Sequence, residues 1–181
     1  MIKLFTIQTC KNYEEGITLF NKYQKNLIGI ITDLRFPLKG KVDKRAGLKL
    51  ASKIRDKEKN IPILIQTTEI SKDRTDDITE HIIDKKSPRF LKELQKFMVL
   101  NFGFGDFKFR MPSGKIIKKA STVKEFYKCI KTIPGESLEF HSSKNHLSNW
   151  LASRGEFNLA GKFREIKKND FRNIEKRRRY H

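Results

Sequence analysis

Asn26-Leu-Ile-Gly-Ile-Ile-Thr-Asp33-Leu-Arg-Phe-Pro37 is the segment of this 181-residue chain that indicates its architecture most directly. Its apolar run predicts a buried β-strand that carries the carboxylate of Asp33 at its C-terminal end, and Pro37 marks a loop soon afterwards. In open α/β sheets, ligands bind at the carboxyl ends of the strands. Asp33 is therefore the first candidate functional residue.

Two later segments have the same character. Ile61-Pro-Ile-Leu-Ile-Gln-Thr67 predicts a second buried strand that ends in a hydroxyl, and His81-Ile-Ile-Asp-Lys85 predicts a third that ends in an ammonium. Apolar residues at helical spacing around these strands favour an α/β architecture. Three helices are predicted. The first runs from Asn12 to Gln24, and the second contains Ala46, Leu50, Ala51 and Ile54. The third begins at Ser87-Pro88, with Phe90, Leu91, Leu94, Phe97 and Met98 facing inward.

An Asp, a Thr and a Lys at the ends of three successive strands resemble the response-regulator receiver domain. In that family the Asp accepts a phosphoryl group, a hydroxyl bonds a phosphoryl oxygen, and the Lys neutralises the phosphoryl charge. The resemblance gives Asp33 the phosphoacceptor-like role and gives Thr67 and Lys85 the phosphoryl-contacting roles. Each residue also has an ordinary structural interpretation, as a helix cap, a buried β-former or one of 40 basic residues.

The resemblance is incomplete before Asp33. The 32 preceding residues predict one strand (Ile2 to Gln8), one helix and the Asp33 strand itself, and they hold no counterpart of the acidic pair with which receivers bind Mg²⁺. Glu14 and Glu15 fall in the first turn of the helix, where they suit its dipole. We therefore expect a truncated flavodoxin-like (receiver) parallel sheet that has no cofactor of its own. It would bind Mg²⁺ and accept a phosphoryl group only if a partner chain supplied the missing acids.

In the receiver strand order the missing first strand is an interior one, which leaves a gap in the sheet. Either Lys3 to Gln8 pairs with Leu27 to Thr32, as the cost of unpaired backbone groups favours, or a strand from another polypeptide fills the gap.

Two further departures from the receiver pattern concern signalling. Lys86 follows Lys85 where receivers usually have Pro, and Ser71 to Glu80 is short for the face through which receivers signal.

Asn101-Phe-Gly-Phe-Gly-Asp106 predicts a turn at a domain boundary, because two glycines among aromatic residues end the preceding helix. Beyond it, the sequence predicts a hairpin (Phe107 to Arg110 and Lys115 to Lys118), a helix begun by the capping box Thr122-x-x-Glu125, and a helical stretch from Lys144 to Phe163. We thus expect a truncated receiver-like domain (1–101), a small C-terminal α+β, mostly helical domain (102–165) and a basic tail (166–181).

Pro134-Gly-Glu-Ser137, followed by His141 and by Asn145-x-Leu147-x-x-Trp150, resembles a small domain of unknown function in bacterial proteins. The pattern of that domain has Phe where this chain has Leu147. Together with the receiver-like segment, it resembles the regulatory region of bacterial phosphoenolpyruvate/pyruvate-binding (pyruvate phosphate dikinase-like) proteins. Their catalytic module has no counterpart in this sequence, so the resemblance implies a regulatory fragment.

His141, His146 and Cys129 are the candidates for base or metal chemistry in the second domain. The histidine spacing does not place the two rings on one helix face, and the three residues lack the paired spacing of a zinc site. Hydrogen-bonding or capping roles are favoured for the histidines. The sequence shows no combination of nucleophile, base and orienting residue, so we expect no catalytic residues and no metal site.

The formal net charge of +19 is spread along the chain, with +8 in residues 1–100 and +11 in residues 101–181. It is most concentrated in the tail at Lys176, Arg177, Arg178 and Arg179. Such a charge attracts polyanions without sequence preference. A basic nucleic-acid-binding protein that uses this tail is therefore one alternative function.

The sequence contains no run of about 18 apolar residues and no signal-like N-terminus, which argues against a membrane span or export. Cys10 and Cys129 are too few for a disulfide framework, which favours a reducing cytoplasm. We expect a cytoplasmic, non-catalytic signalling or interaction module, a pseudo-receiver fragment of a phosphotransfer protein that binds a protein partner. The second alternative is a phosphoaccepting receiver completed by a partner chain.

Overall fold

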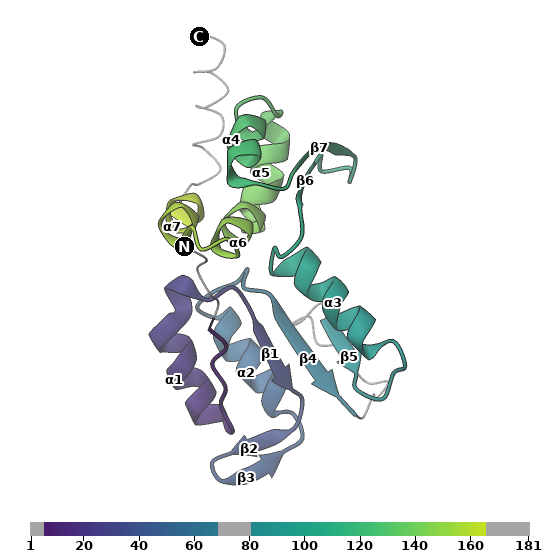
Figure 1. The fold of residues 1–181 in the computed structure, drawn as a ribbon. Coiled ribbons are helices and arrows are strands. Elements are labelled where there is room, and N and C mark those ends of the chain that lie inside the picture. Colours follow the sequence, from purple (N-terminus) through teal and green to yellow (C-terminus); the bar gives the residue numbers. More distant parts are fainter. Residues whose placement is uncertain (1–5, 69–80, 166–181) are drawn as a thin grey trace. The chain divides into compact units, whose positions relative to one another are not determined.

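The computed structural model describes residues 6–68 and 81–165 of the chain (Figure 1). The chain divides into two compact units, with the N-terminal unit spanning Phe5–Met98 and the C-terminal unit beginning at Val99. The predicted division lies three residues later, after position 101. The short segment from Ser71 to Glu80 and the basic residues at 176–179 lie outside the described residues.

The N-terminal unit is built on a three-stranded parallel sheet, which confirms the α/β architecture. Its strands follow the order β1-β4-β5, and each pair of neighbours is parallel. The elements of this unit are α1 (Tyr13–Tyr23), a 3-10 helix (Gln24–Asn26), β1 (Ile30–Asp33), β2 (Phe36–Leu38), β3 (Lys41–Asp43), α2 (Ala46–Arg55), β4 (Ile63–Thr67), β5 (His81–Asp84) and most of α3 (Phe90–Asn101).

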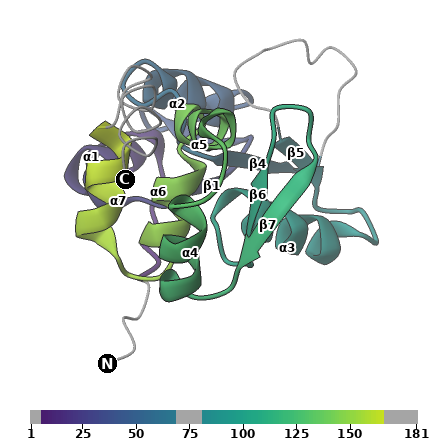
Figure 2. The same ribbon diagram turned by 90° about the horizontal axis from the view of Figure 1, so that it is seen from above.

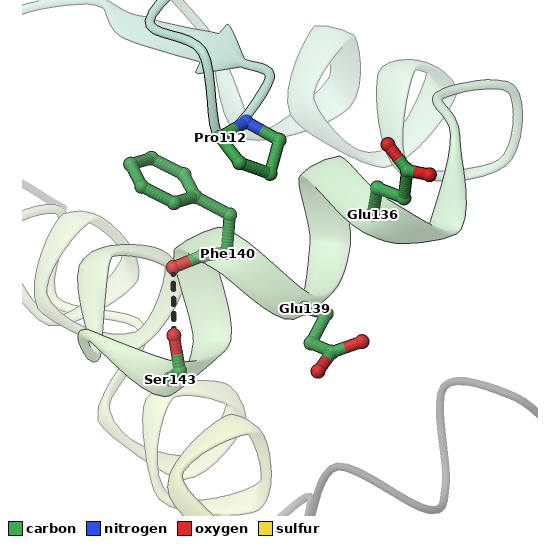
Figure 3. A pocket seen from close by; sticks show the side chains of 5 residues that line it. All are labelled: Pro112, Glu136, Glu139, Phe140 and Ser143. Atoms are coloured by element: carbon green, nitrogen blue, oxygen red, sulfur yellow. Dashed lines mark hydrogen bonds between the residues drawn. The ribbon is translucent and has the colours of Figure 1, made fainter.

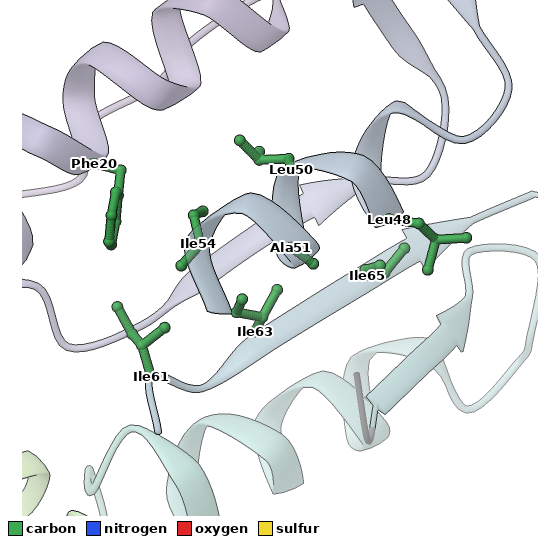
Figure 4. Packing of buried hydrophobic residues seen from close by; sticks show 8 residues of the cluster. All are labelled: Phe20, Leu48, Leu50, Ala51, Ile54, Ile61, Ile63 and Ile65. Carbon is green, nitrogen blue, oxygen red and sulfur yellow. The ribbon is translucent and has the colours of Figure 1, made fainter. Parts of the chain in front are cut away.

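The core of the N-terminal unit lies between α1, α2 and strand β4 (Figure 4). Ile63 and Ile65 of β4 pack against the apolar face of α2, and Phe20 of α1 closes the cluster. Leu64, whose side chain leaves the opposite face of the strand, is also fully buried (0% exposed). Because β4 is the central strand and is covered on both faces, its sequence is a continuous apolar run rather than an alternating one.

The predicted strand from Ile2 to Gln8 is wrong over its described part. Thr6–Gln8 are not in a strand, and the side chain of Ile7 is 87% exposed. Thr-Ile-Gln alternates polar and apolar residues, and such a segment stays in a sheet only when one face is covered. Within residues 6–68 and 81–165, β1 pairs with β4 alone, so the expected pairing of residues 3–8 with 27–32 does not form over residues 6–8.

Two other predictions in the N-terminal unit need correction. The loop after Asp33 is a hairpin, in which β2 and β3 are joined by Lys39 and Gly40 with φ values of 52° and 76°. Those values suit a two-residue hairpin turn, for which an X-Gly pair is the sequence signal. Leu91 of α3 does not face inward but is 75% exposed, because it lies about a third of a turn around the helix from the buried Phe97.

The C-terminal unit combines a β-hairpin with four helices among its described residues (Figure 2). The predicted hairpin is confirmed, with a bulge between Phe109 and Arg110, and so is the capping box, in which Thr122 accepts a hydrogen bond from the Glu125 N–H. The elements are β6 (Phe107–Arg110), β7 (Ile116–Ala120), α4 (Val123–Ile130), α5 (Gly135–Ser143), α6 (His146–Ala152) and α7 (Phe157–Glu165).

The stretch from Lys144 to Phe163, predicted as one helical segment, is divided into α6 and α7. Gly155 adopts φ 75°, and its N–H donates to the carbonyl of Ala152. A glycine in this conformation ends a helix because other residues enter it only with strain. Helix α5 was not predicted; it begins directly after Pro134, where the following backbone can enter a helix.

The Asn101–Asp106 turn supports the core of the C-terminal unit. A Cβ atom on Gly103 would lie 2.8 Å from the Trp150 Cα, so glycine permits this close approach. The indole N–H of Trp150 donates to the carbonyl of Gly105, and the ring stacks on Phe126 with centroids 4.6 Å apart. Arg154 donates to both glycine carbonyls and lies 3.5 Å from the Trp150 ring centroid. The turn therefore organises the core as well as marking the boundary.

Within the described part of the chain, no helix is both long and apolar enough to cross a membrane.

Gly47 provides a test of how α2 docks on the strand that carries Asp33. A Cβ atom on Gly47 would lie 2.2 Å from the Asp33 carbonyl oxygen, whereas one on Gly16 would meet side chains at 3.4 Å or more. We expect Gly47→Ala to lower the free energy of unfolding by about 1–3 kcal/mol, despite the better helix propensity of Ala. Gly16→Ala should be neutral or stabilising. Urea denaturation measures both, and equal stability of the two variants would contradict the close packing.

Candidate functional site at the carboxyl ends of the parallel strands

The parallel strands bring Asp33, Thr67 and Lys85 to one edge of the sheet. Asp33 is the last residue of β1 and lies opposite Gln66, and Thr67 is the last residue of β4. The Lys85 N–H donates to the Thr67 carbonyl at 2.7 Å, which continues the strand ladder one residue beyond β5. Since parallel neighbours end at the same edge, the three predicted site residues come together although they are far apart in sequence.

Asp33 and Lys85 form an ion pair at this edge. The Lys85 Nζ lies 2.6 Å from the Asp33 Oδ1, with 43% of the Asp33 side chain and 33% of the Lys85 side chain exposed. The Oδ1 atom itself is shielded from solvent and accepts no hydrogen bond of favourable geometry. The ammonium of Lys85 is therefore the charge that compensates this carboxylate oxygen.

Thr67 occupies a different environment from the other two residues. It is 6% exposed, as expected for a β-branched residue in the central strand of a covered sheet. The strand order thus places Thr67 between the acidic and the basic residue, but the surrounding core encloses it. The phosphoryl-contacting roles of Thr67 and Lys85 and the phosphoacceptor-like role of Asp33 remain predictions.

Lys86, which stands where receivers usually have Pro, has a specific local role. Its N–H donates to the Asp84 Oδ1 at 2.8 Å, and the Ser87 N–H donates to the Asp84 carbonyl. A proline could not make the first of these bonds because it has no N–H. The turn after β5 is therefore held by an aspartate side chain that bonds the backbone two residues on.

Among the three predicted site residues at this edge, only Asp33 offers a carboxylate to Mg²⁺. Asp33 is already paired with an ammonium, and Mg²⁺ prefers several oxygen ligands in near-octahedral order. Across residues 6–68 and 81–165, no three His, Cys, Asp or Glu side chains lie close enough together to hold a metal ion. An Mg²⁺ site here would need more oxygen ligands than the Asp33 carboxylate provides.

Two histidines meet in the C-terminal unit. The Nδ1 atoms of His141, on α5, and His146, on α6, lie 3.1 Å apart. The expectation that their spacing would keep them off one face overlooked the break between the helices, where Asn145 adopts φ 57° and turns the chain back. The third zinc candidate, Cys129, does not join them, because its thiol contacts the carbonyl of Lys119.

The hydrogen bonds of His141 define its tautomer. Its Nε2 accepts from the Arg110 N–H at 2.8 Å, so the neutral ring carries its proton on Nδ1 and donates to His146. Burial, followed by the electrostatic repulsion that a charged His141 would meet from His146, Arg110 and Lys144, lowers the pKa of His141 from 6.5 to about 3. His141 is therefore a neutral structural histidine, in keeping with the hydrogen-bonding role that the sequence favours.

A small pocket of about 260 Å³ lies beside α5 (Figure 3). Phe140 and Pro112 form its apolar side, and the Ser143 hydroxyl donates to the Phe140 carbonyl. Two carboxylates, Glu136 and Glu139, complete the lining. The predicted site residues that the structure describes, Asp33, Thr67 and Lys85, are not among the residues that line this pocket.

Comparison with known proteins gives no match: no family model, no curated protein and no solved structure resembles this chain closely enough to indicate its relatives.

A double-mutant cycle measures the Asp33–Lys85 pair. Because both side chains are partly exposed, we expect a coupling energy of about 0.5–1 kcal/mol between Asp33→Asn and Lys85→Met. Urea denaturation of the two single variants and the double variant gives this value. Strictly additive effects would show that the two charges do not interact in solution.

The His141 environment predicts acid sensitivity. The pKa of His141 in the folded state lies below its ordinary value. The stabilisation that depends on neutral His141 is therefore complete above pH 6.5 and is lost as the pH falls towards about 3. The loss approaches about 1.4 kcal/mol per pH unit. Fluorescence of Trp150, the single tryptophan, follows urea unfolding of this unit between neutral pH and pH 5.

The matched variant is His141→Gln, which removes the titrating group while keeping an oxygen that can accept from Arg110. Its free energy of unfolding should change less with pH over the same range than that of the unmodified chain. An identical pH dependence would assign the acid sensitivity to other groups.

Proposed function

We propose that this chain is a non-catalytic signalling or interaction module whose N-terminal unit is a pseudo-receiver with a truncated flavodoxin-like sheet. The observation that carries this proposal is the ion pair between Asp33 and Lys85 at the carboxyl edge of β1, β4 and β5. The strand order supports it, since Asp33 and Thr67 end β1 and β4 and Lys85 directly follows β5, in the order of the resembling family. The cytoplasm is the compartment proposed for such a module.

The acidic pair with which receivers bind Mg²⁺ has no counterpart in residues 1–32, and this favours a pseudo-receiver over an active one. A phosphoacceptor must offer a carboxylate oxygen to the incoming phosphorus, and nearby cations must stabilise the charge that develops on the phosphoryl oxygens. In this chain the Lys85 ammonium is bound to Asp33, and one oxygen of that carboxylate is shielded from solvent. The other described carboxylate at this edge, that of Asp84, accepts a hydrogen bond from the Lys86 N–H in the turn after β5.

In this proposal, the interaction function is carried by a fixed surface rather than by a phosphorylation cycle. The Asp33–Lys85 pair holds the ends of the two outer strands, and β4 passes between them. The described segments that follow β1 and β5 then present a constant shape to a protein partner. The larger phosphotransfer protein that the sequence resembles is the proposed context for that partner.

The test is incubation of the purified chain with acetyl phosphate and Mg²⁺, comparing the unmodified chain with Asp33→Asn. We expect no incorporation of phosphate that depends on Asp33, because the carboxylate is paired and the acidic metal ligands are missing. Intact-mass spectrometry and Phos-tag electrophoresis provide the readout, and an active receiver serves as the positive control.

Asp33-dependent labelling of the chain alone would overturn the pseudo-receiver proposal. Labelling that appears only with a partner chain would instead support the alternative in which that partner supplies the missing acids. Lys85→Met separates these cases further, since it should reduce labelling of an active receiver and leave a pseudo-receiver unlabelled.

A further inference from the structure

Positive charge is concentrated in the β6–β7 hairpin and the helix that follows it. Residues 107–132 contain eight Lys or Arg residues and one acidic residue, whereas the whole chain has 40 basic and 21 acidic residues. All of these positions are described by the structure, unlike the basic tail. The eight are Lys108, Arg110, Lys115, Lys118, Lys119, Lys124, Lys128 and Lys131.

Helix α4 separates this charge from the core. Its inner side carries Phe126, which is 2% exposed and stacks on Trp150. Three lysines and one tyrosine are exposed at the helical spacing i, i+3, i+4 and i+7, so they share the outer side. These four residues, which we call the α4 basic face, are Lys124, Tyr127, Lys128 and Lys131.

The hairpin extends the α4 basic face. Helix α4 packs alongside β7 (Figure 2), with the Cys129 thiol against the Lys119 carbonyl at 3.8 Å. The Lys118 Nζ donates to the Thr132 hydroxyl at 2.6 Å, which holds this ammonium at the C-terminal end of the helix. The charge of β7 and the charge of α4 therefore lie on one continuous surface.

Local acids neutralise little of this surface. Glu125, the one acid within residues 107–132, turns back to accept from the Ser121 N–H at the start of α4. Asp106 pairs with Lys119 at 2.7 Å, so the charge of Lys119 is compensated within the chain. Besides Lys119, the cations that come from β7 and from the α4 basic face are Lys118, Lys124, Lys128 and Lys131.

An aromatic ring lies among these cations. Tyr127 is 60% exposed, and the Lys131 Nζ lies 4.3 Å from its ring centroid. Rings of this kind bind the faces of nucleic-acid bases, and flanking lysines bind the phosphates.

We propose that the α4 basic face, with Lys118 beside it, binds single-stranded nucleic acid. An unpaired base stacks on Tyr127, and the phosphates on either side contact the lysines of α4 and β7. A duplex keeps its bases stacked inside the helix and cannot offer one to Tyr127 without opening. The tyrosine therefore distinguishes this surface from a general attraction of the basic chain for polyanions.

The test measures binding of a fluorescein-labelled single-stranded RNA of about 12 nucleotides, and of its duplex, to the full chain by fluorescence anisotropy. One variant combines Lys124→Gln, Lys128→Gln and Lys131→Gln. Its matched control combines Lys44→Gln, Lys53→Gln and Lys59→Gln, three exposed lysines of the N-terminal unit. Both variants lose the same net charge, and circular dichroism checks that both are folded.

We expect the α4 variant to lose at least about tenfold in affinity for the single strand. Its salt dependence should weaken, with the slope of log K against log salt becoming less negative by about 2. The control variant should lose much less and keep its slope. Tyr127→Ala should weaken single-strand binding about tenfold with little change for the duplex, and Tyr127→Phe should bind normally.

Three results would overturn the proposal. The first is an equal loss in the two lysine variants, which would indicate attraction by net charge alone. The second is equal binding of single strand, duplex and heparin with no effect of Tyr127→Ala. The third is loss of binding when Lys176, Arg177, Arg178 and Arg179 are replaced by Gln while the α4 variant still binds, which would place the contact in the tail.

Discussion

The burial of β4 on both faces is the constraint on which the N-terminal unit depends. Ile63 and Ile65 face helix α2 and Leu64 the opposite side, so β4 can only be the central strand of the sheet. β1 and β5 must then flank it, and in a parallel sheet their carboxyl ends meet at one edge. Gly47 contributes to the same packing, because it lets the backbone of α2 touch the end of β1.

The two units stabilise their polar groups by different means. The sheet edge places an acid and a base in contact where both still meet solvent, so their pairing contributes modestly to stability. The C-terminal unit instead encloses polar groups among aromatic rings. His141 is held neutral by one backbone donor and a second histidine, while Arg154 covers Trp150 and bonds the carbonyls of the glycine turn. Its packing therefore depends on hydrogen bonds that only one backbone arrangement provides.

The basic surface of the C-terminal unit can be recognised only from the positions that its charged residues take in the fold. Counted along the sequence, lysines occur throughout both units, and the tail has the densest cluster. In the folded C-terminal unit, helical periodicity directs the α4 lysines and Tyr127 to one side, and the Lys118–Thr132 bond joins the hairpin to them. A surface thus forms from residues whose individual spacing carries no recognisable motif.

The sequence by itself determined the α/β architecture, the three strand ends, the hairpin and the capped helix α4, because local apolar patterns and caps depend on near neighbours. Tertiary structure decided the rest. Gln8 and its described neighbours stayed out of the sheet for lack of cover, and Asn145 and Gly155 divided the last helical region by backbone geometry. The Asp33–Lys85 contact and the His141–His146 pair also needed the fold, because a sequence lists side chains but only packing sets the distance between them.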